Sequence, residues 1–297
     1  MRFGARGGAP HCDLRDVRFR THMILTMFRL DKMLGTLLDR RQPVVVVVLG
    51  HQKGGTTAIA RLLGSMCDMP VSVDPFYAVD RGRARAVDRI FRGELALSKV
   101  ARRHPSLFWQ PIVKEPDFTF LWREVIDLYP QARFVYVARD PLDSIRSILK
   151  RLDLPGNPSP GPLPRMRNPT RHWELILSGR LPEVVGDDYV DRLARRWQLA
   201  VDTYTEHRDQ IVLVRYEDFL SDKVAELARL ARDLELAVKR DVSAEVDVSY
   251  QHPGDSEVDL LEFFGPQRIE HIATLCARGM QSLGYSLATR DSSSRGR

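Results

Sequence analysis

The sequence has few cysteines and no long apolar run. Only three cysteines occur among 297 residues, and Cys12, Cys67 and Cys276 lack the spacing of a metal site. An odd number of distant thiols is typical of a reducing compartment, so we expect a cytoplasmic protein. No stretch of 18 apolar residues is present, and charges interrupt residues 23–38. We therefore expect neither a transmembrane segment nor a signal peptide.

Two further classes of partner lack support in the sequence. No acidic cluster suggests a metal site, and no lysine-rich tail or RNA-binding aromatic motif suggests a nucleic-acid partner. The formal net charge is nevertheless +6. A basic excess without those motifs fits an anionic small ligand better than nucleic acid.

The most informative stretch is residues 43–64, which read PVVVVVLGHQKGGTTAIARLLG. Residues 44–49 form a β-branched apolar run, which predicts a strand buried on both faces of a parallel sheet. Gly50 opens a glycine-rich turn, and helical spacing resumes at Ala58. A strand, a glycine-rich turn and a helix N-terminus together point backbone N–H groups at one spot, where phosphate or sulfate binds.

The position of the lysine in this turn argues against an ordinary nucleoside triphosphatase. Gly50 and Gly55 have the separation of the two glycines in a Walker A loop. The next residue is Thr56, whereas a Walker loop has lysine there, and Lys53 lies inside the turn. A P-loop kinase or NTPase stays an alternative, as does a glycine turn that only joins a strand to a helix.

The remaining pattern predicts one α/β domain with a parallel sheet and right-handed crossovers. We expect an N-terminal extension at residues 1–40, a domain at 41–289 and a disordered tail at 290–297. We expect an amphipathic helix at 22–40 that packs on the domain. Alternatively, this helix binds a membrane surface or forms a homodimer contact. The expected strands are 44–49, 109–114, 133–138 and 210–216. The expected helices are 58–63, one or two within 80–103, 118–129, 142–152, 189–206, 224–236 and 263–283. The segments 67–77 and 155–169 are expected to be loops, the second a lid or linker.

A second candidate anion site lies in residues 133–151, RFVYVARDPLDSIRSILKR. Arg139 falls at the carboxyl end of a predicted strand, and Ser147 lies eight residues later on a predicted helix. Arg151 follows one helical turn after Ser147. A guanidinium and a hydroxyl at the edge where α/β sheets bind ligands would hold a phosphate. Alternatively, Arg139 pairs with a neighbouring aspartate and Ser147 is a surface residue.

These motifs together resemble sulfotransferases that use 3′-phosphoadenosine-5′-phosphosulfate (PAPS), most closely the tyrosylprotein and bacterial types. The resemblance rests on K-G-G-T-T in the first turn, R-F-V-Y-V-A-R-D-P with the later serine, and R-Y-E-D-F-L at residues 215–220. It spans roughly residues 41–289 and implies a three-layer, P-loop-NTPase-like α/β fold. Gly54 departs from the family pattern in one respect, because it replaces the serine that is usual at this position.

The resemblance assigns roles to the matching residues. The loop residues would hold the 5′-phosphosulfate, and Arg139, Ser147 and Arg151 would hold the 3′-phosphate. The loop residues are His51, Gln52, Lys53, Gly54, Gly55, Thr56 and Thr57. Tyr216 would lie against the adenine, although a core tyrosine is nearly as good an interpretation.

The reaction implied is transfer of a sulfuryl group from PAPS to an acceptor hydroxyl or amine, without a required metal. Lys53 would stabilise the leaving phosphate, and Lys114 matches a family lysine that contacts the sulfuryl group. Asp74, 17 residues after Thr57, stands where the tyrosylprotein type has a glutamate base. Glu115 is the rival base. The acceptor is a small molecule, glycan or peptide, and a nucleotide-binding module without catalysis is the non-enzyme alternative.

Overall fold

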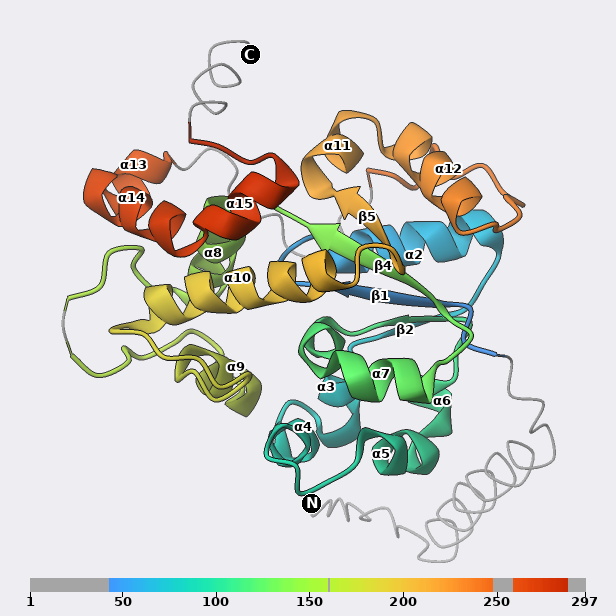
Figure 1. Ribbon diagram of the computed structural model, residues 1–297, viewed down its shortest axis with the longest axis horizontal. Coiled ribbons are helices and arrows are strands. Elements are labelled where there is room, and N and C mark those ends of the chain that lie inside the picture. The colour runs from blue at the N-terminus through green and yellow to red at the C-terminus, as the bar shows by residue number, and fades with distance from the viewer. Residues whose placement is uncertain (1–42, 160, 248–258, 288–297) are drawn as a thin grey trace, which may run out of the picture. The chain divides into compact units, whose positions relative to one another are not determined.

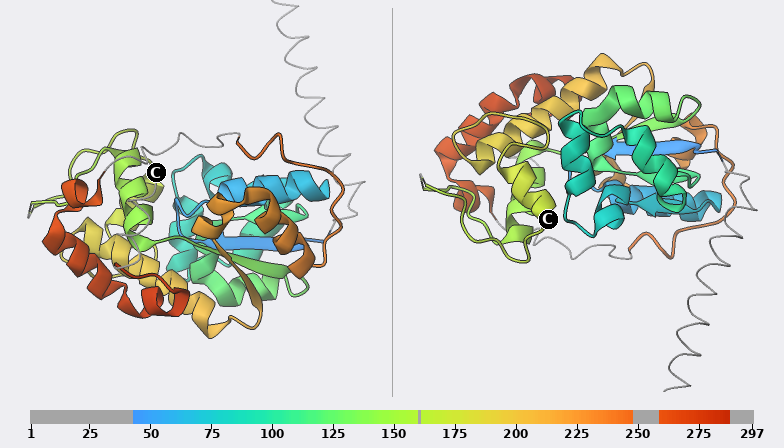
Figure 2. Two further views of the ribbon diagram at one scale, coloured as in Figure 1. Left: turned by 90° about the horizontal axis from the view of Figure 1, so that it is seen from above. Right: turned by 90° about the horizontal axis from the view of Figure 1, so that it is seen from below.

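The computed structural model describes residues 43–159, 161–247 and 259–287. The predicted N-terminal extension, its helix at 22–40 and the tail at 290–297 lie outside these residues. Within them, the predicted α/β class is confirmed. The described chain has five parallel strands in the order β2-β3-β1-β4-β5, and helices cover both faces of the sheet (Figures 1 and 2).

Strand β1 is the centre of this sheet. The strands are β1 (Val46–Gly50), β2 (Val71–Val73), β3 (Ile112–Lys114), β4 (Arg133–Ala138) and β5 (Ile211–Arg215). Every residue of β1 is buried, because Val46 and Val48 face one hydrophobic cluster while Val47 and Leu49 face the other. A strand that is apolar on both faces needs a helix layer on each side, which explains the unbroken valine run.

The helices follow the strands along the chain as the sequence pattern indicated. They are α2 (Thr56–Cys67), α3 (Pro75–Asp80), α4 (Arg85–Phe91), α5 (Leu97–Arg103), α6 (Pro105–Phe108), the 3₁₀ helix η1 (Pro116–Leu121), α7 (Trp122–Leu128), α8 (Pro141–Leu152), α9 (Arg171–Leu177), α10 (Tyr189–Glu206), α11 (Tyr216–Ser221), α12 (Lys223–Asp233), α13 (Leu260–Phe264), α14 (Pro266–Leu275) and α15 (Ala277–Leu283).

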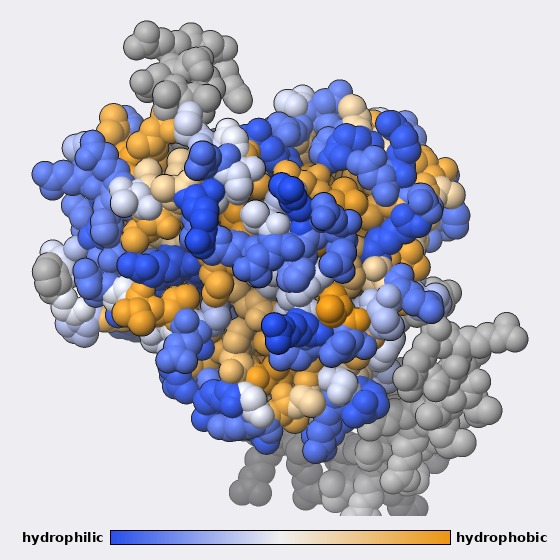
Figure 3. Space-filling model, viewed as in Figure 1, coloured by the Kyte–Doolittle hydropathy of each residue, from blue (hydrophilic) through white to orange (hydrophobic). Residues whose placement is uncertain are grey.

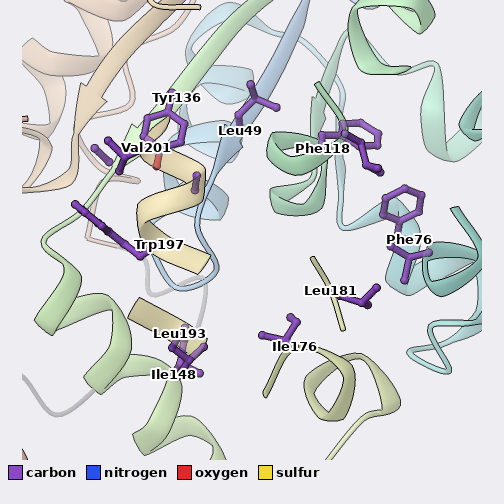
Figure 4. Close-up of a cluster of buried hydrophobic side chains, with 14 of the residues drawn as sticks. Leu49, Phe76, Phe118, Tyr136, Ile148, Ile176, Leu181, Leu193, Trp197 and Val201 are labelled. Carbon is purple, nitrogen blue, oxygen red and sulfur yellow. The ribbon is translucent and has the colours of Figure 1, made fainter. Parts of the chain in front are cut away.

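The two faces of the sheet carry separate cores. Helices α2 and α12 pack on one face, where Leu62 and Leu230 are among the buried residues. The larger core on the other face includes residues of α7 and α10. In Figure 4, Trp197 and Val201 of α10 lie beside Tyr136 of β4. Helix α10 thus connects the sheet with the helices that follow β4.

Residues 67–77 were wrongly expected to be a loop. They contain β2, the edge strand, and the start of α3. A strand of three residues gives too little periodicity to recognise, and its pairing with β3 supplies the hydrogen bonds that the local sequence does not specify. This strand sets the position of Asp74, which follows it directly.

Three other element predictions also need correction. The single helix expected at 263–283 is divided into α13, α14 and α15, since Gly265 has a φ of 76° and Pro266 starts a new helix. Helix α9 was not predicted, because it is only seven residues long and follows the proline-rich segment. Tyr216 begins α11 and does not extend β5. The irregular loop expected at 155–169 is confirmed for the residues described there.

Within the described ranges, none of the helices combines the length and the apolar character needed to cross a bilayer. The face shown in Figure 3 is largely hydrophilic, with apolar side chains scattered in small groups.

The close contact between α2 and β2 gives a first prediction. A Cβ on Gly64 would lie 2.2 Å from a methyl of Val71 and 2.8 Å from the carbonyl oxygen of Met69. Gly64→Ala therefore forces the backbone of the β2 connection to move. We expect a loss of about 1–2 kcal/mol in the free energy of unfolding, measured in urea, although alanine favours helix by ~1 kcal/mol.

Lys99→Ala is the matched control, since Lys99 is an exposed residue of α5. It should change the free energy of unfolding by less than about 0.5 kcal/mol. A Gly64→Ala protein as stable as this control would contradict the tight α2–β2 packing.

Candidate functional site

The two predicted anion-binding segments meet at one edge of the sheet. In the β1–β4 register, Gly50 lies opposite Val137, so the loop after β1 and the segment after β4 leave the sheet side by side. Arg139 is the first residue after β4, and its Nη1 donates to the carbonyl oxygen of Lys53 at 2.9 Å. The structure therefore brings Lys53 and Arg139 together at one edge of the sheet.

The backbone of the first loop is shaped to present N–H groups. Gly55 precedes α2 with φ 90° and makes no side-chain cap, and Lys53 has φ 64°. A left-handed conformation at a lysine costs about 1–2 kcal/mol, a strain that is common where a loop forms an anion-binding nest. Thr56 and Thr57 form the first turn of α2, and both are nearly buried.

This conformation also accounts for the departure at Gly54. A Cβ on Gly54 would lie 2.9 Å from the carbonyl oxygen of His51, so the serine of the family pattern would require the loop to shift. At Gly55 a Cβ would lie 2.2 Å from the ring of Tyr216. Both glycines are therefore required by close contacts in this loop.

Four basic side chains converge on this loop. Burial, together with the positive charges of Arg151, Arg139 and Lys114, lowers the pKa of Lys53 to about 8. Like charges gathered in a partly desolvated place repel one another. A bound anion would relieve that repulsion, which makes the cluster a strong candidate for phosphate or sulfate binding.

Residues of α10 and α11 hold the segment after β4. Trp197 of α10 donates from Nε1 to the Arg139 carbonyl oxygen at 2.9 Å. Glu217 of α11 accepts from the Asp140 N–H at 2.9 Å and from the Tyr285 hydroxyl at 2.7 Å. The Tyr216 ring lies 4.7 Å from the guanidinium carbon of Arg139. These contacts fix the direction in which Arg139 leaves the sheet.

Helix α8 carries the other two residues expected at the 3′-phosphate. Ser147 is almost fully buried on α8, and Arg151 lies one turn later with an exposed side chain. Arg151 is close enough to lower the pKa of Lys53, so it belongs to the same cluster of charge. The ring of Tyr216, which we expect to contact an adenine, lies close to both Gly55 and Arg139.

Asp74 and Lys114 form an ion pair on the neighbouring strand ends. In the β2–β3 register Val73 lies opposite Lys114, which brings the next residue, Asp74, beside the lysine. Lys114 Nζ lies 2.6 Å from Asp74 Oδ1. The Asp74 side chain is 40% exposed and that of Lys114 only 4%. A carboxylate at the edge of the sheet, open to solvent, can accept a proton from a ligand.

Glu115 has a different environment from Asp74. Its side chain is buried, and its two carboxyl oxygens accept from the N–H groups of Phe76 (3.1 Å) and Asp117 (3.3 Å). Burial and the neighbouring carboxylates Asp117 and Asp74 raise the pKa of Glu115. The carboxyl group thus joins the start of α3 to the start of η1.

His51 and Gln52 support the loop from below. The His51 side chain is buried, and burial and the charge of Arg196 lower its pKa to about 3, so it is neutral. Gln52 donates from Nε2 to Asp117 Oδ1 at 3.0 Å and accepts from Arg196 at 3.0 Å. Only the backbone groups of these two residues stay in the candidate anion site.

The network of buried ion pairs that contacts Gln52 was not predicted from the sequence. Arg196 of α10 lies 2.6 Å from Asp117 of η1, both fully buried, and His172 of α9 lies 2.9 Å from the other Asp117 oxygen. Although burial opposes it, His172 and Arg196 lower the pKa of Asp117. The apolar spacing from Leu193 to Ala200 puts Arg196 on the buried face of its helix, a signal that was available.

Comparison with known proteins identifies the family of this chain. Residues 75–240, more than half of the chain, match the sulfotransferase family. The chain therefore belongs to that family. The matched segment includes Arg139 and Tyr216 but begins after the loop at residues 51–57. No curated protein sequence matches the chain.

Solved structures add a similar fold at low sequence identity. The sulfotransferase STF9 from Mycobacterium avium is 14% identical with a TM-score of 0.52, and the match covers 88% of this chain and 82% of that one. Mouse sulfotransferase SULT7A1, complexed with PAP, is 17% identical with a TM-score of 0.47, covering 80% and 84%. A sulfotransferase from Alicyclobacillus acidocaldarius is 15% identical with a TM-score of 0.47, covering 84% and 98%. The first of these supports the fold.

The lowered pKa of Lys53 predicts how anion affinity depends on pH. Sulfate does not titrate near neutrality, and it favours the charged form of Lys53. As pH rises through about 8, the free protein loses the Lys53 charge. Sulfate affinity should then fall, by up to about tenfold at one pH unit above that pKa. Thermal stabilisation by sulfate, measured from pH 7 to 9.5 against chloride of equal ionic strength, reports this change.

Lys53→Arg is the control variant, because a guanidinium stays charged throughout this range. Its sulfate affinity should be nearly independent of pH. An equal decline in both proteins would show that Lys53 is not the titrating group.

Proposed function

We propose that this sulfotransferase uses PAPS as its donor and passes the sulfuryl group to a hydroxyl or amine of its acceptor. The observation that carries the proposal is the contact between Arg139 and Lys53, with Arg151 and Lys114 beside them. PAPS carries two separate anionic groups, the 3′-phosphate and the 5′-phosphosulfate. Two anion-binding segments at adjacent strand ends match that charge distribution.

Each segment has a distinct role in the proposal. The loop N–H groups, Lys53, Thr56 and Thr57 bind the 5′-phosphosulfate. Arg139, Ser147 and Arg151 bind the 3′-phosphate, with a guanidinium available for a bidentate contact. Tyr216 contacts the adenine, which an aromatic face can bind by stacking.

The chemistry follows from the charges that develop during transfer. The bond between sulfur and the bridging oxygen of the 5′-phosphate breaks, and a bond between sulfur and the acceptor oxygen or nitrogen forms. Lys53 stabilises the charge that develops on the leaving phosphate, and Lys114 contacts the transferring group. Asp74 takes the proton from the acceptor. The products are the sulfated acceptor and adenosine 3′,5′-bisphosphate.

Asp74 is preferred to Glu115 as the base because of where the two carboxylates lie. Asp74 is partly exposed at the sheet edge and is paired with Lys114, whereas both oxygens of Glu115 are bound to backbone N–H groups inside the fold. The Lys114 ammonium also keeps Asp74 oriented toward the strand ends. Glu115 is assigned to the support of α3 and η1.

The test of the donor is binding of adenosine 3′,5′-bisphosphate by calorimetry. Loss of a charged hydrogen bond costs about 1.5–3 kcal/mol, so Arg139→Ala should weaken binding by about ten- to a hundredfold. Arg208→Ala is the control, since Arg208 is 71% exposed after α10, and it should leave affinity within about twofold.

Two results would contradict the donor assignment. One is a wild-type protein that does not bind the bisphosphate. The other is magnesium-dependent ATP hydrolysis without transfer of radiolabelled sulfate from PAPS to any of a panel of phenols, sugars, amines and peptides, which would favour a P-loop kinase.

The base assignment is tested by Asp74→Asn and Glu115→Gln. Removal of a general base lowers kcat by about 10²- to 10⁴-fold, so Asp74→Asn should do so while bisphosphate affinity stays within about twofold. Glu115→Gln should instead lower the melting temperature and have the smaller effect on kcat. Initial rates with radiolabelled PAPS and thermal unfolding measure the two effects, and the reverse order of rate losses would make Glu115 the base.

A further inference from the structure

Two adjoining cavities lie beside α9, away from the residues assigned to the donor. One has a volume of about 540 Å³ and the other about 420 Å³, and both are lined by Arg171 and Leu175. The larger cavity also has apolar walls, to which Leu163 and Met166 contribute. Because the two cavities share an arginine and a leucine of their linings, they adjoin each other, and we refer to the pair as the recess.

The charge of this recess is strongly positive. Five arginines and only two carboxylates line it. The two carboxylates are already paired, Glu174 with Arg171 at 2.8 Å and Asp88 with Arg180 at 3.3 Å.

The other three arginines are Arg83, Arg85 and Arg165, all of them exposed. Among the described residues, none of the three forms an ion pair. The nearby Asp80 carboxylate accepts from the backbone N–H groups of Ala84 and Arg85, so it caps α4, and it forms no ion pair with Arg83 or Arg85 among the described residues. The residues that line the recess therefore carry a net positive charge.

The position of the recess relates it to the proposed reaction. Arg83 follows α3, whose first residue comes directly after Asp74. Helix α3, which is six residues long, therefore connects the proposed base to the segment that carries Arg83. On α9, Arg171 lines the recess while the next residue, His172, contacts Asp117 beneath the donor loop. In Figure 1, α9 lies on the same side of the molecule as α3 and α4.

The geometry points to a binding site for an anionic group on the acceptor. This inference rests on the proposed function, which places the reacting hydroxyl near Asp74. The acceptor class that fits is a hydroxylated carboxylic acid with an apolar body. Its hydroxyl meets Asp74, its body contacts the apolar wall with Leu175, and its carboxylate pairs with Arg83 and Arg165. A neutral alcohol would leave those arginines without a partner.

The test uses calorimetry with adenosine 3′,5′-bisphosphate in saturating amounts, so that the donor site is filled. The probe is 10-hydroxydecanoate, and 1,10-decanediol is its neutral counterpart. We expect the hydroxy acid to bind at least about tenfold more tightly than the diol. The double variant Arg83→Gln/Arg165→Gln should lose most of this preference.

The control is Arg102→Gln/Arg208→Gln, which removes the same charge from exposed positions that line neither cavity. It should keep the wild-type preference. Equal affinity for acid and diol, no measurable binding of the acid, or the same loss in both double variants would each overturn the inference. Failure of the bisphosphate to bind is a separate result, and it would contradict the donor assignment.

Discussion

The hydrogen bond from the Arg139 guanidinium to the Lys53 carbonyl oxygen, 2.9 Å long, joins the two halves of the candidate site. It exists because β1 and β4 are adjacent parallel strands whose carboxyl ends stop at the same level. The bond draws one cation to the loop that already carries another, and burial together with the charges of Arg151, Arg139 and Lys114 lowers the pKa of Lys53. Such repulsion persists in a folded protein only where the surroundings impose it, and it favours a bound anion.

Two sets of packing contacts hold the positive charges of Lys53 and Arg139 close together. Below the loop, Gln52 is bound to the buried Asp117–Arg196 pair, and Arg196 also lies 4.0 Å from the ring of Phe120. Breaking a buried pair of this kind is costly, because either partner alone would be an uncompensated charge. Beside the loop, Trp197 holds the backbone that precedes α8. Helix α10 supplies both Arg196 and Trp197, so one helix supports the loop and the arginine together.

The sequence predicted the parts of this site that depend on local order. The valine run, the glycine turn and the strand that ends at Arg139 each have their own periodicity, so their adjacency follows from the rules for parallel sheets. The prediction from the sequence failed where tertiary contacts determine the structure. The three residues of β2 gain their pairing only from β3, and the roles of Asp74 and Glu115 depend on exposure, which neighbouring side chains determine. The ion pair of Arg196 was not predicted, because its partner Asp117 lies 79 positions away in the chain.

The position of Lys53 within the loop explains why its two functions can be separated. In a Walker loop the lysine belongs to the start of the helix, but here it precedes α2 with a positive φ of 64°. That conformation turns its carbonyl oxygen to Arg139, while the side chain carries the charge that an anion requires. The contact with Arg139 uses only the backbone of residue 53, so it does not require the lysine ammonium. The loop geometry can therefore persist when the lysine charge is removed. In the proposed reaction, this separates positioning of the anion from stabilisation of the charge that develops on it.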